Sequence, residues 1–156
     1  MQQSISAASY GDRFHQSVNG TMIVIAEDNA EVGRMIRSFV EEIDSDVIEA
    51  IDGSTAVEAY ERVRPDWVLR DINLRPLDGL SAMRAILEKH PDARIVVVSQ
   101  HQDASITLAM GAHAFVYKED LGSIRDLIAE EIIRKNEAAS TEKRLTERAP
   151  LPQFEA

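Results

Sequence analysis

Short apolar runs alternate along this chain with longer stretches in which apolar residues recur every three or four positions. Runs bounded by turn residues are typical of strands buried on both faces of a sheet. We therefore predict parallel strands at 22–26, 46–50, 67–71, 94–99 and 114–117. The second run is the most polar, which favours a place near the sheet edge.

Amphipathic helices are predicted between these strands. Val32, Ile36 and Val40 lie on one helical face, and Asp28 or Asn29 is placed to cap that helix. The remaining helices are predicted after the Asp52-Gly53-Ser54 turn, at 80–90, from Asp103 to Gly111, and from Asp120 or Ser123 onward, where Ile124, Leu127, Ile128 and Ile132 form one face. Right-handed crossovers then predict a doubly wound α/β fold, flavodoxin-like, with a five-stranded parallel sheet in the order 2-1-3-4-5 and five helices.

The pattern divides the chain into three parts. Residues 1–20 are rich in Ser, Gln and Asn and are expected to form a flexible N-terminal arm. The folded domain is expected over 21–135. Residues 136–156 form a polar tail whose helix propensities permit an extension of the last helix, which Pro150 and Pro152 would end.

Composition narrows the function classes. The 156 residues suit one domain, and 17 Lys and Arg against 27 Asp and Glu give a net charge of −10. This balance argues against direct nucleic-acid binding and suits a protein that holds a cation or meets a basic partner. The chain has no cysteine, no secretory signal pattern and no apolar run long enough to cross a bilayer. We expect a cytoplasmic protein without membrane contacts.

Chemically active side chains follow the predicted strands. Because the carboxyl ends of parallel strands share one sheet edge, these residues are expected to meet there. They are Glu27, Asp28, Asp71, Ser99 and Lys118. Three crowded carboxylates repel one another, and a divalent cation relieves the repulsion; oxygen ligands of this kind favour magnesium. An ammonium and a hydroxyl suit phosphoryl oxygens, so the set predicts phosphoryl transfer to a carboxylate.

Each of these residues has an ordinary structural explanation when it is considered alone. Glu27 and Asp28 suit a helix cap, and Asp71 suits the start of a turn. Ser99 suits a strand end and Lys118 a solvated surface. Their joint placement at the ends of the predicted strands favours the functional interpretation.

With these residues in place, the chain resembles the receiver domain of two-component response regulators, chemotaxis regulators included, from about residue 22 to residue 135. The matching positions are Glu27-Asp28 for the acidic pair, Asp71 for the phosphoacceptor, Ser99 for the switch hydroxyl, Phe115 for the switch aromatic and Lys118 for the lysine.

The resemblance implies a mechanism. Asp28, Asp71 and the backbone carbonyl of Asn73 would bind Mg²⁺ with help from Glu27. Asp71 would take a phosphoryl group from the phosphohistidine of a histidine kinase or histidine phosphotransfer protein.

The resemblance also implies a switch. Lys118 and Ser99 would engage the phosphoryl group, and Phe115 would move inward. The face formed by the helix at 103–111, the strand at 114–117 and the last helix would then exchange a downstream protein partner, and it offers a surface for a phosphorylation-dependent dimer.

Two further expectations come from the family. Asn73 and His101 occupy positions that tune dephosphorylation, although a surface histidine is the ordinary explanation for His101. The chain is expected to phosphorylate and dephosphorylate itself, and it is not expected to be a turnover enzyme.

Three residues depart from the family pattern. Glu119 stands after the lysine where proline is usual, which affects the shape of that loop. Arg75 stands where a proline is common. Arg70 stands where an apolar residue is usual, and its side chain is expected either to extend to the surface or to reach a partner.

Other functions stay open at the level of sequence. Ser99-Gln100-His101 and Lys118-Glu119-Asp120 resemble receivers that precede a DNA-binding output domain, so the chain is either a stand-alone receiver or a fragment of a longer regulator. A non-phosphorylated docking pseudo-receiver is another alternative. An aspartate-nucleophile phosphatase usually carries an acid at the position of Asn73, and a flavin or nucleotide phosphate would be repelled by Glu27-Asp28-Asn29.

Overall fold

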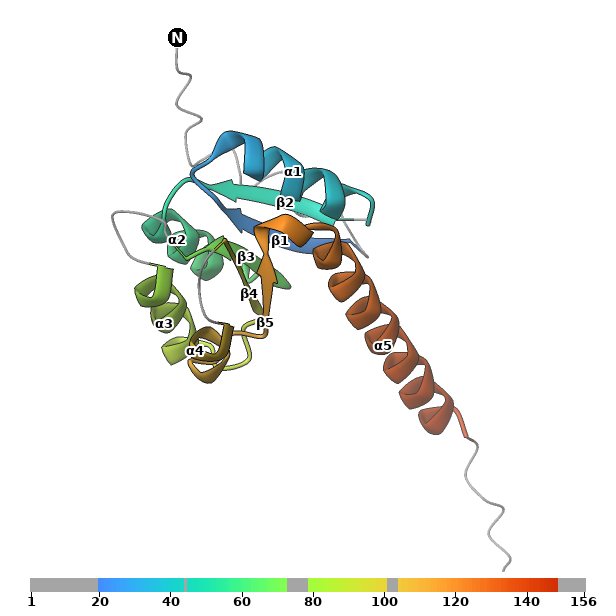
Figure 1. Cartoon of the computed structure of the whole chain (residues 1–156). Coiled ribbons are helices and arrows are strands. Elements are labelled where there is room, and N and C mark those ends of the chain that lie inside the picture. The colour runs from blue at the N-terminus through green and yellow to red at the C-terminus, as the bar shows by residue number, and fades with distance from the viewer. Residues whose placement is uncertain (1–19, 44, 73–78, 101–103, 149–156) are drawn as a thin grey trace, which may run out of the picture.

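The computed structural model describes residues 20–43, 45–72, 79–100 and 104–148. Within these ranges the chain forms a five-stranded sheet in the order β2-β1-β3-β4-β5, with every neighbouring pair parallel. Helices cover both faces of the sheet (Figure 1). The predicted flavodoxin-like α/β fold is confirmed.

The strands lie close to their predicted positions. They are β1 (Thr21–Ala26), β2 (Ser45–Ala50), β3 (Trp67–Asp71), β4 (Ile95–Ser99) and β5 (Ala114–Tyr117). All five residues of β3 and all five of β4 are buried, as expected for central strands with helices on both sides. The more polar β2 lies at one edge, as its composition predicts.

The helices lie near their predicted positions, and two of them begin at caps that the sequence predicts. They are α1 (Ala30–Glu41), α2 (Gly53–Val63), α3 (Gly79–Lys89), α4 (Ala104–Ala109) and α5 (Gly122–Thr146). Asn29 caps α1 by accepting hydrogen bonds from the backbone amides of Glu31 and Val32. Asp52 and Thr55 form a capping box at the start of α2. The cap Asp103 predicted for α4 lies outside the described residues.

Two apolar layers hold the sheet between the helices. On one face, Ile36 and Val40 of α1 and Ile124 and Ile128 of α5 pack with the side chain of Trp67. On the other face, α2 and α3 pack with residues that alternate with the first set along the strands, and α4 lies on the same side (Figure 1). These apolar layers cover the two faces of the sheet, so polar side chains can lie at the carboxyl ends of the strands.

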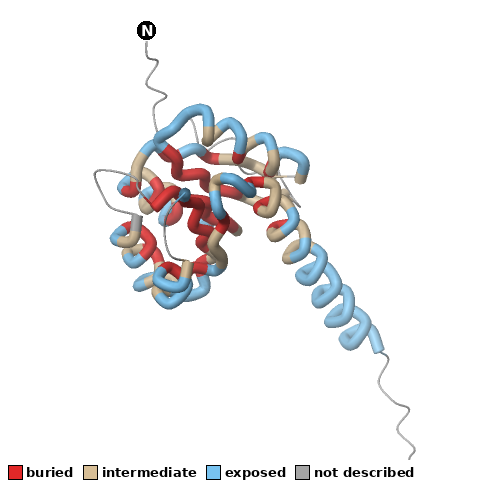
Figure 2. The backbone as a smooth tube through the Cα atoms, viewed as in Figure 1, coloured by how far each residue is buried: buried red, intermediate tan, exposed pale blue. Residues whose placement is uncertain are grey.

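Helix α5 continues well past Lys135. It spans 25 residues, and every residue from 133 to 148 is exposed (Figure 2). Lys135 Nζ lies 3.8 Å from Asp66 Oδ1, and Arg94 pairs with Glu131 at 3.3 Å, so the middle of α5 contacts the residues that precede β3 and β4. The predicted arm lies outside the described residues, except for Gly20, and so do residues 149–156.

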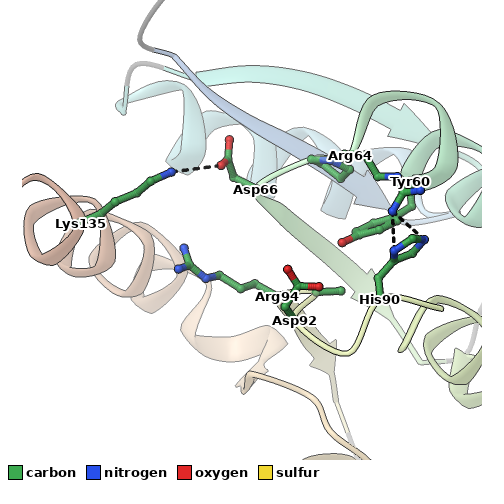
Figure 3. A pocket seen from close by; sticks show the side chains of 9 residues that line it. Tyr60, Arg64, Asp66, His90, Asp92, Arg94 and Lys135 are labelled. Atoms are coloured by element: carbon green, nitrogen blue, oxygen red, sulfur yellow. Dashed lines mark hydrogen bonds and ion pairs between the residues drawn. The ribbon is translucent and has the colours of Figure 1, made fainter. Parts of the chain in front are cut away.

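A cavity of about 380 Å³ lies at that same amino-terminal edge of the sheet, opposite the end that carries Asp71. Charged side chains of both signs line it, among them Asp66, Asp92, Arg94 and Lys135 (Figure 3). No helix in the described ranges is long and apolar enough to cross a membrane.

Candidate functional site

Three carboxylates meet at the carboxyl-terminal edge of the sheet. Glu27 and Asp28 follow β1, and Asp71 ends β3, which pairs directly with β1. One oxygen from each of the three lies within 4.8 Å of the others. Glu27 and Asp71 are buried, whereas Asp28 is exposed. The sequence predicted this meeting from strand order alone.

Lys118 links two of these acids. Its Nζ donates a hydrogen bond to Asp71 Oδ2 at 2.9 Å and forms an ion pair with Glu27 Oε2 at 3.2 Å. Burial by itself lowers the pKa of Lys118, but the hydrogen bond and charge of Asp71, together with Glu27, outweigh it and raise that pKa above its usual value. Lys118 is therefore a fixed cation at the carboxylate of Asp71.

Burial dominates the acidity of Glu27. Desolvation raises the pKa of Glu27, and the charge of Asp71 raises it further, while a hydrogen bond from the backbone amide of Asn29 and the charge of Lys118 oppose the shift. The net effect is a pKa above the usual 4.5. The ionised site therefore holds a carboxylate that another positive charge would stabilise.

Ser99 completes the edge at the end of β4. Its side chain is fully buried, and its Oγ has no hydrogen-bond partner among the described residues. A buried hydroxyl is normally hydrogen-bonded, so this oxygen is suited to a group that enters the site.

Phe115 lies on the neighbouring strand β5, two residues before Tyr117. It is partly buried, and its ring centroid lies 4.9 Å from that of Tyr117.

The donor set suits a hard divalent cation. All three candidate side-chain ligands are carboxylates, and cysteine is absent from the chain. Oxygen-only ligands favour magnesium or calcium over zinc, and an exposed member such as Asp28 leaves room for the water ligands that magnesium keeps. The residues therefore fit Mg²⁺.

Comparison with known proteins decides the family. The model of the response regulator receiver domain matches residues 23–129, which include all of β2 to β5 and all of β1 except its first two residues. The chain belongs to the response regulator receiver domain family. Receiver domains interact with histidine kinases and downstream effectors, and they typically bind Mg²⁺ at an acidic pocket such as the one described above.

Individual relatives agree with this assignment. The chain is similar to the chemotaxis protein CheY of Listeria monocytogenes, with 34% identity over 100 residues that cover 62% of this chain and 84% of that protein. It is also similar to the transcriptional regulatory protein DegU of Brevibacillus brevis, with 37% identity over 76 residues, 47% of this chain but only 32% of DegU. The chain thus spans about a third of that relative.

A solved structure supports the same fold. The response regulator domain of Thermotoga maritima CheB superimposes with a TM-score of 0.62 and 26% sequence identity, covering 74% of this chain and 95% of that domain. The flavodoxin-like topology is therefore shared with an experimentally determined receiver.

The loops of this receiver carry the remaining sequence predictions. Asn73, Arg75 and His101 lie outside the described residues. Where the family usually has proline, Glu119 lies within a 3-10 turn over Lys118–Asp120, which leads through Leu121 into α5. The chain thus leaves β5 through a helical turn, and Lys118 lies at its start.

The structure excludes one of the two expectations for Arg70. Its side chain does not extend to the surface, because the residue is only 1% exposed. It lies in β3 between two strands that also pack against helices, so both of its neighbours in register, Ala26 and Val97, are themselves buried. The apolar run around Arg70 indicated a buried strand, but it did not predict where the guanidinium lies.

The raised pKa of Glu27 predicts a pH effect on the stability of this receiver. A carboxyl whose pKa is higher in the folded chain contributes stability that is fully present below its unfolded pKa of 4.5 and is lost as pH rises through the folded pKa. Glu27→Gln stays neutral throughout. Without divalent cations, its free energy of unfolding relative to wild type is therefore expected to increase between pH 4.5 and neutral pH.

Urea unfolding at a series of pH values measures this effect. Glu58→Gln, which neutralises an exposed carboxyl on α2, is the matched control and is expected to stay parallel to wild type. A Glu27→Gln curve that also runs parallel to wild type would show that burial does not govern the acidity of Glu27.

Proposed function

We propose that this receiver takes a phosphoryl group onto Asp71 from the phosphohistidine of a histidine kinase or histidine phosphotransfer protein in a two-component phosphorelay. The observation that carries the proposal is the buried Ser99 Oγ, which lacks a partner among the described residues and belongs to the same strand edge as the Lys118–Asp71 pair. A phosphoryl group on Asp71 would supply oxygens for both side chains.

The transfer step follows from the groups present. An Oδ atom of Asp71 attacks phosphorus, an O–P bond forms, and the N–P bond of the phosphohistidine breaks. The electron pair of that bond stays on the imidazole nitrogen, which takes a proton from solvent. Hydrolysis later returns the Asp71 carboxylate and inorganic phosphate, and the family assigns Asn73 and His101 to tuning this step.

Charge is the main obstacle to this reaction. The attacking carboxylate and the phosphoryl oxygens are negative, and Glu27 adds another anion at the site. Lys118 offsets part of this charge from the side of β5. Glu27, Asp28 and Asp71, with the carbonyl of Asn73, would hold Mg²⁺, which supplies further positive charge at the phosphoryl oxygens.

The switch uses the described edge of the sheet. Once phosphoryl oxygens replace the Asp71 carboxylate as partners of Lys118, Ser99 Oγ donates to one of them and Phe115 follows inward. Ile106, Leu108 and Tyr117 are each about half exposed on α4 and β5, so this face has apolar area for a downstream protein or for a second phosphorylated copy. The chain acts as a self-modifying switch and not as a turnover enzyme.

A second candidate is the receiver portion of a longer transcriptional regulator. The similarity to DegU, which covers only 32% of that protein, favours it. The phosphoacceptor chemistry is the same in both cases, and only the downstream partner differs.

Beryllofluoride, which mimics a phosphoryl group on a carboxylate, tests the proposed function. With Mg²⁺ present, titration of the full chain is expected to shift the backbone amide NMR signals of Ser99, Phe115 and Lys118. Without Mg²⁺ the same titration is expected to have no effect. Binding that proceeds equally well without Mg²⁺, or shifts that spare these three residues, would contradict the proposal; a docking pseudo-receiver would give no shifts.

A further inference from the structure

The cavity at the amino-terminal edge of the sheet contains a buried hydroxyl group. Tyr60 of α2 lines this cavity, and the residue is only 6% exposed. Figure 3 shows its hydroxyl oxygen directed into the cavity, and no hydrogen bond joins this oxygen to any residue that the structure describes. Buried hydroxyl groups are normally hydrogen-bonded. The Tyr60 hydroxyl is therefore suited to a group that occupies the cavity.

The same hydroxyl stays protonated at ordinary pH. Burial raises the pKa of Tyr60 above its usual value, and the charge of the exposed Asp92 raises it further, while Arg64 opposes the shift. The hydroxyl therefore keeps its proton and can donate a hydrogen bond into the cavity.

Cations outnumber acids along the cavity, although the whole chain has a net charge of −10. The fully charged lining residues are Arg64, Arg94, Lys135, Asp66 and Asp92. Asp66 is already engaged, because its Oδ2 accepts a hydrogen bond from the backbone amide of Met22 at 2.9 Å. The lining therefore favours an anionic ligand over a cationic one.

Two of the cations have only weak partners. Lys135 Nζ lies 3.8 Å from Asp66 Oδ1, beyond hydrogen-bond distance. Arg94 pairs with Glu131 at 3.3 Å, and its guanidinium lies 5.4 Å from the centre of the Trp67 ring. Ion pairs that solvent reaches contribute little to stability, so both cations can pair with an anion that enters the cavity.

These groups lie at two sides of the cavity. Arg94 and Lys135 extend from one side, and the hydroxyl of Tyr60 points in from the other (Figure 3). The cavity volume of about 380 Å³ lies within the range of small-molecule sites. A ligand that contacts both sides carries an anionic group at one end and a hydrogen-bond acceptor at the other.

We propose that this cavity binds a small hydroxylated organic anion. Its phosphate or carboxylate group pairs with Arg94 and Lys135, and its hydroxyl oxygen accepts a hydrogen bond from Tyr60. The cavity lies at the opposite edge of the sheet from Asp71, so binding requires neither Mg²⁺ nor phosphoryl transfer.

Calorimetric titration of the full chain without Mg²⁺ tests this proposal. Glycerol 3-phosphate, malate or both are expected to bind saturably, and whichever binds identifies the anionic group as phosphate, carboxylate or either. Binding is also expected to change the fluorescence of Trp67, the one tryptophan of the chain, because Arg94 lies over its ring. Inorganic phosphate lacks the hydroxyl and is expected to bind at least about fivefold more weakly than the organic anion that binds.

Three variants test the named contacts. Arg94→Met and Lys135→Met are each expected to weaken binding of the organic anion by about tenfold. Tyr60→Phe removes only the hydroxyl and is expected to weaken it by about fivefold. Arg84→Met, which removes an exposed cation of α3 outside the cavity, is the matched control and is expected to leave the affinity unchanged.

Several results would overturn the proposal. The first is a wild-type chain that binds neither glycerol 3-phosphate nor malate. The second is an affinity that Tyr60→Phe and Lys135→Met both leave unchanged; the side chain of Lys135 is 69% exposed, so its replacement is expected to fold even if Arg94→Met does not. The third is an equal loss in Arg84→Met, which would show attraction to general positive charge and not to this cavity.

Discussion

Asp71→Asn is expected to reduce phosphoryl incorporation from acetyl phosphate and Mg²⁺ to background. The amide has nearly the size of the carboxylate and can still accept a hydrogen bond from Lys118, so the fold of the site is preserved. It lacks the negative charge and the nucleophilic oxygen that attack phosphorus. The loss of incorporation therefore reports the chemistry and not the folding of the chain.

Radiolabelled acetyl phosphate, followed by acid precipitation and counting, measures this incorporation. Asp92→Asn is the matched control because Asp92 is an exposed carboxylate at the opposite edge of the sheet. It is expected to incorporate label as wild type does. Equal incorporation in Asp71→Asn and wild type would remove Asp71 from the role of phosphoacceptor.

Lys118→Met is expected to destabilise the metal-free protein by about 2–3 kcal/mol at neutral pH, near the lower end of the effect of breaking a buried ion pair. The substitution removes the cation that contacts both Asp71 and Glu27, whose side chains are 6% and 1% exposed. The side chain of Lys118 is itself 14% exposed, so water recovers part of the lost interaction. The effect should shrink in acid, because protonation of Glu27 removes one of the negative charges that Lys118 compensates.

Denaturant unfolding in the presence of a chelator measures this loss. Lys89→Met is the control, because Lys89 forms an exposed ion pair with Glu61 at 3.8 Å. Such a pair contributes only about 0–1 kcal/mol. If Lys118→Met is no less stable than Lys89→Met, the ion-pair geometry at the acidic cluster does not hold in solution.

Much of this fold follows from the apolar pattern. β5 has the bounds predicted from the sequence, and β1 and β4 each differ by one residue at the start. The pattern succeeds because central strands with helices on both faces must be apolar without interruption. The strand-end placement of Glu27, Asp71, Ser99 and Lys118 then follows from topology.

The extent of α5 does not follow from the same pattern. Residues 133–146 have no apolar stripe that packs on the domain, and they are exposed. The helix continues there because Ala, Glu, Lys and Arg have high helix propensity. Propensity permits a helix without requiring one, so the sequence predicted an allowed extension and not an end point.

Arg70 shows where pattern reasoning falls short for the site. A charged residue inside a strand is normally expected to extend its head to water. Here β1 and β4 lie on both sides of β3, and helices cover both faces, so no path to water is short. That conclusion needs the packing of the helices, which local sequence does not determine. The Ser99 Oγ without a described partner is likewise a property of packing.

Borohydride reduction of the acetyl phosphate-treated wild-type chain, followed by peptide mass spectrometry, tests the central claim most directly. Borohydride reduces an aspartyl phosphate to homoserine, so it marks the acceptor residue without any substitution. The phosphoacceptor role of Asp71 predicts homoserine at position 71 and at no other aspartate, and only when Mg²⁺ is present during phosphorylation. Homoserine at Asp28 or at another acid, or none at all, would contradict it.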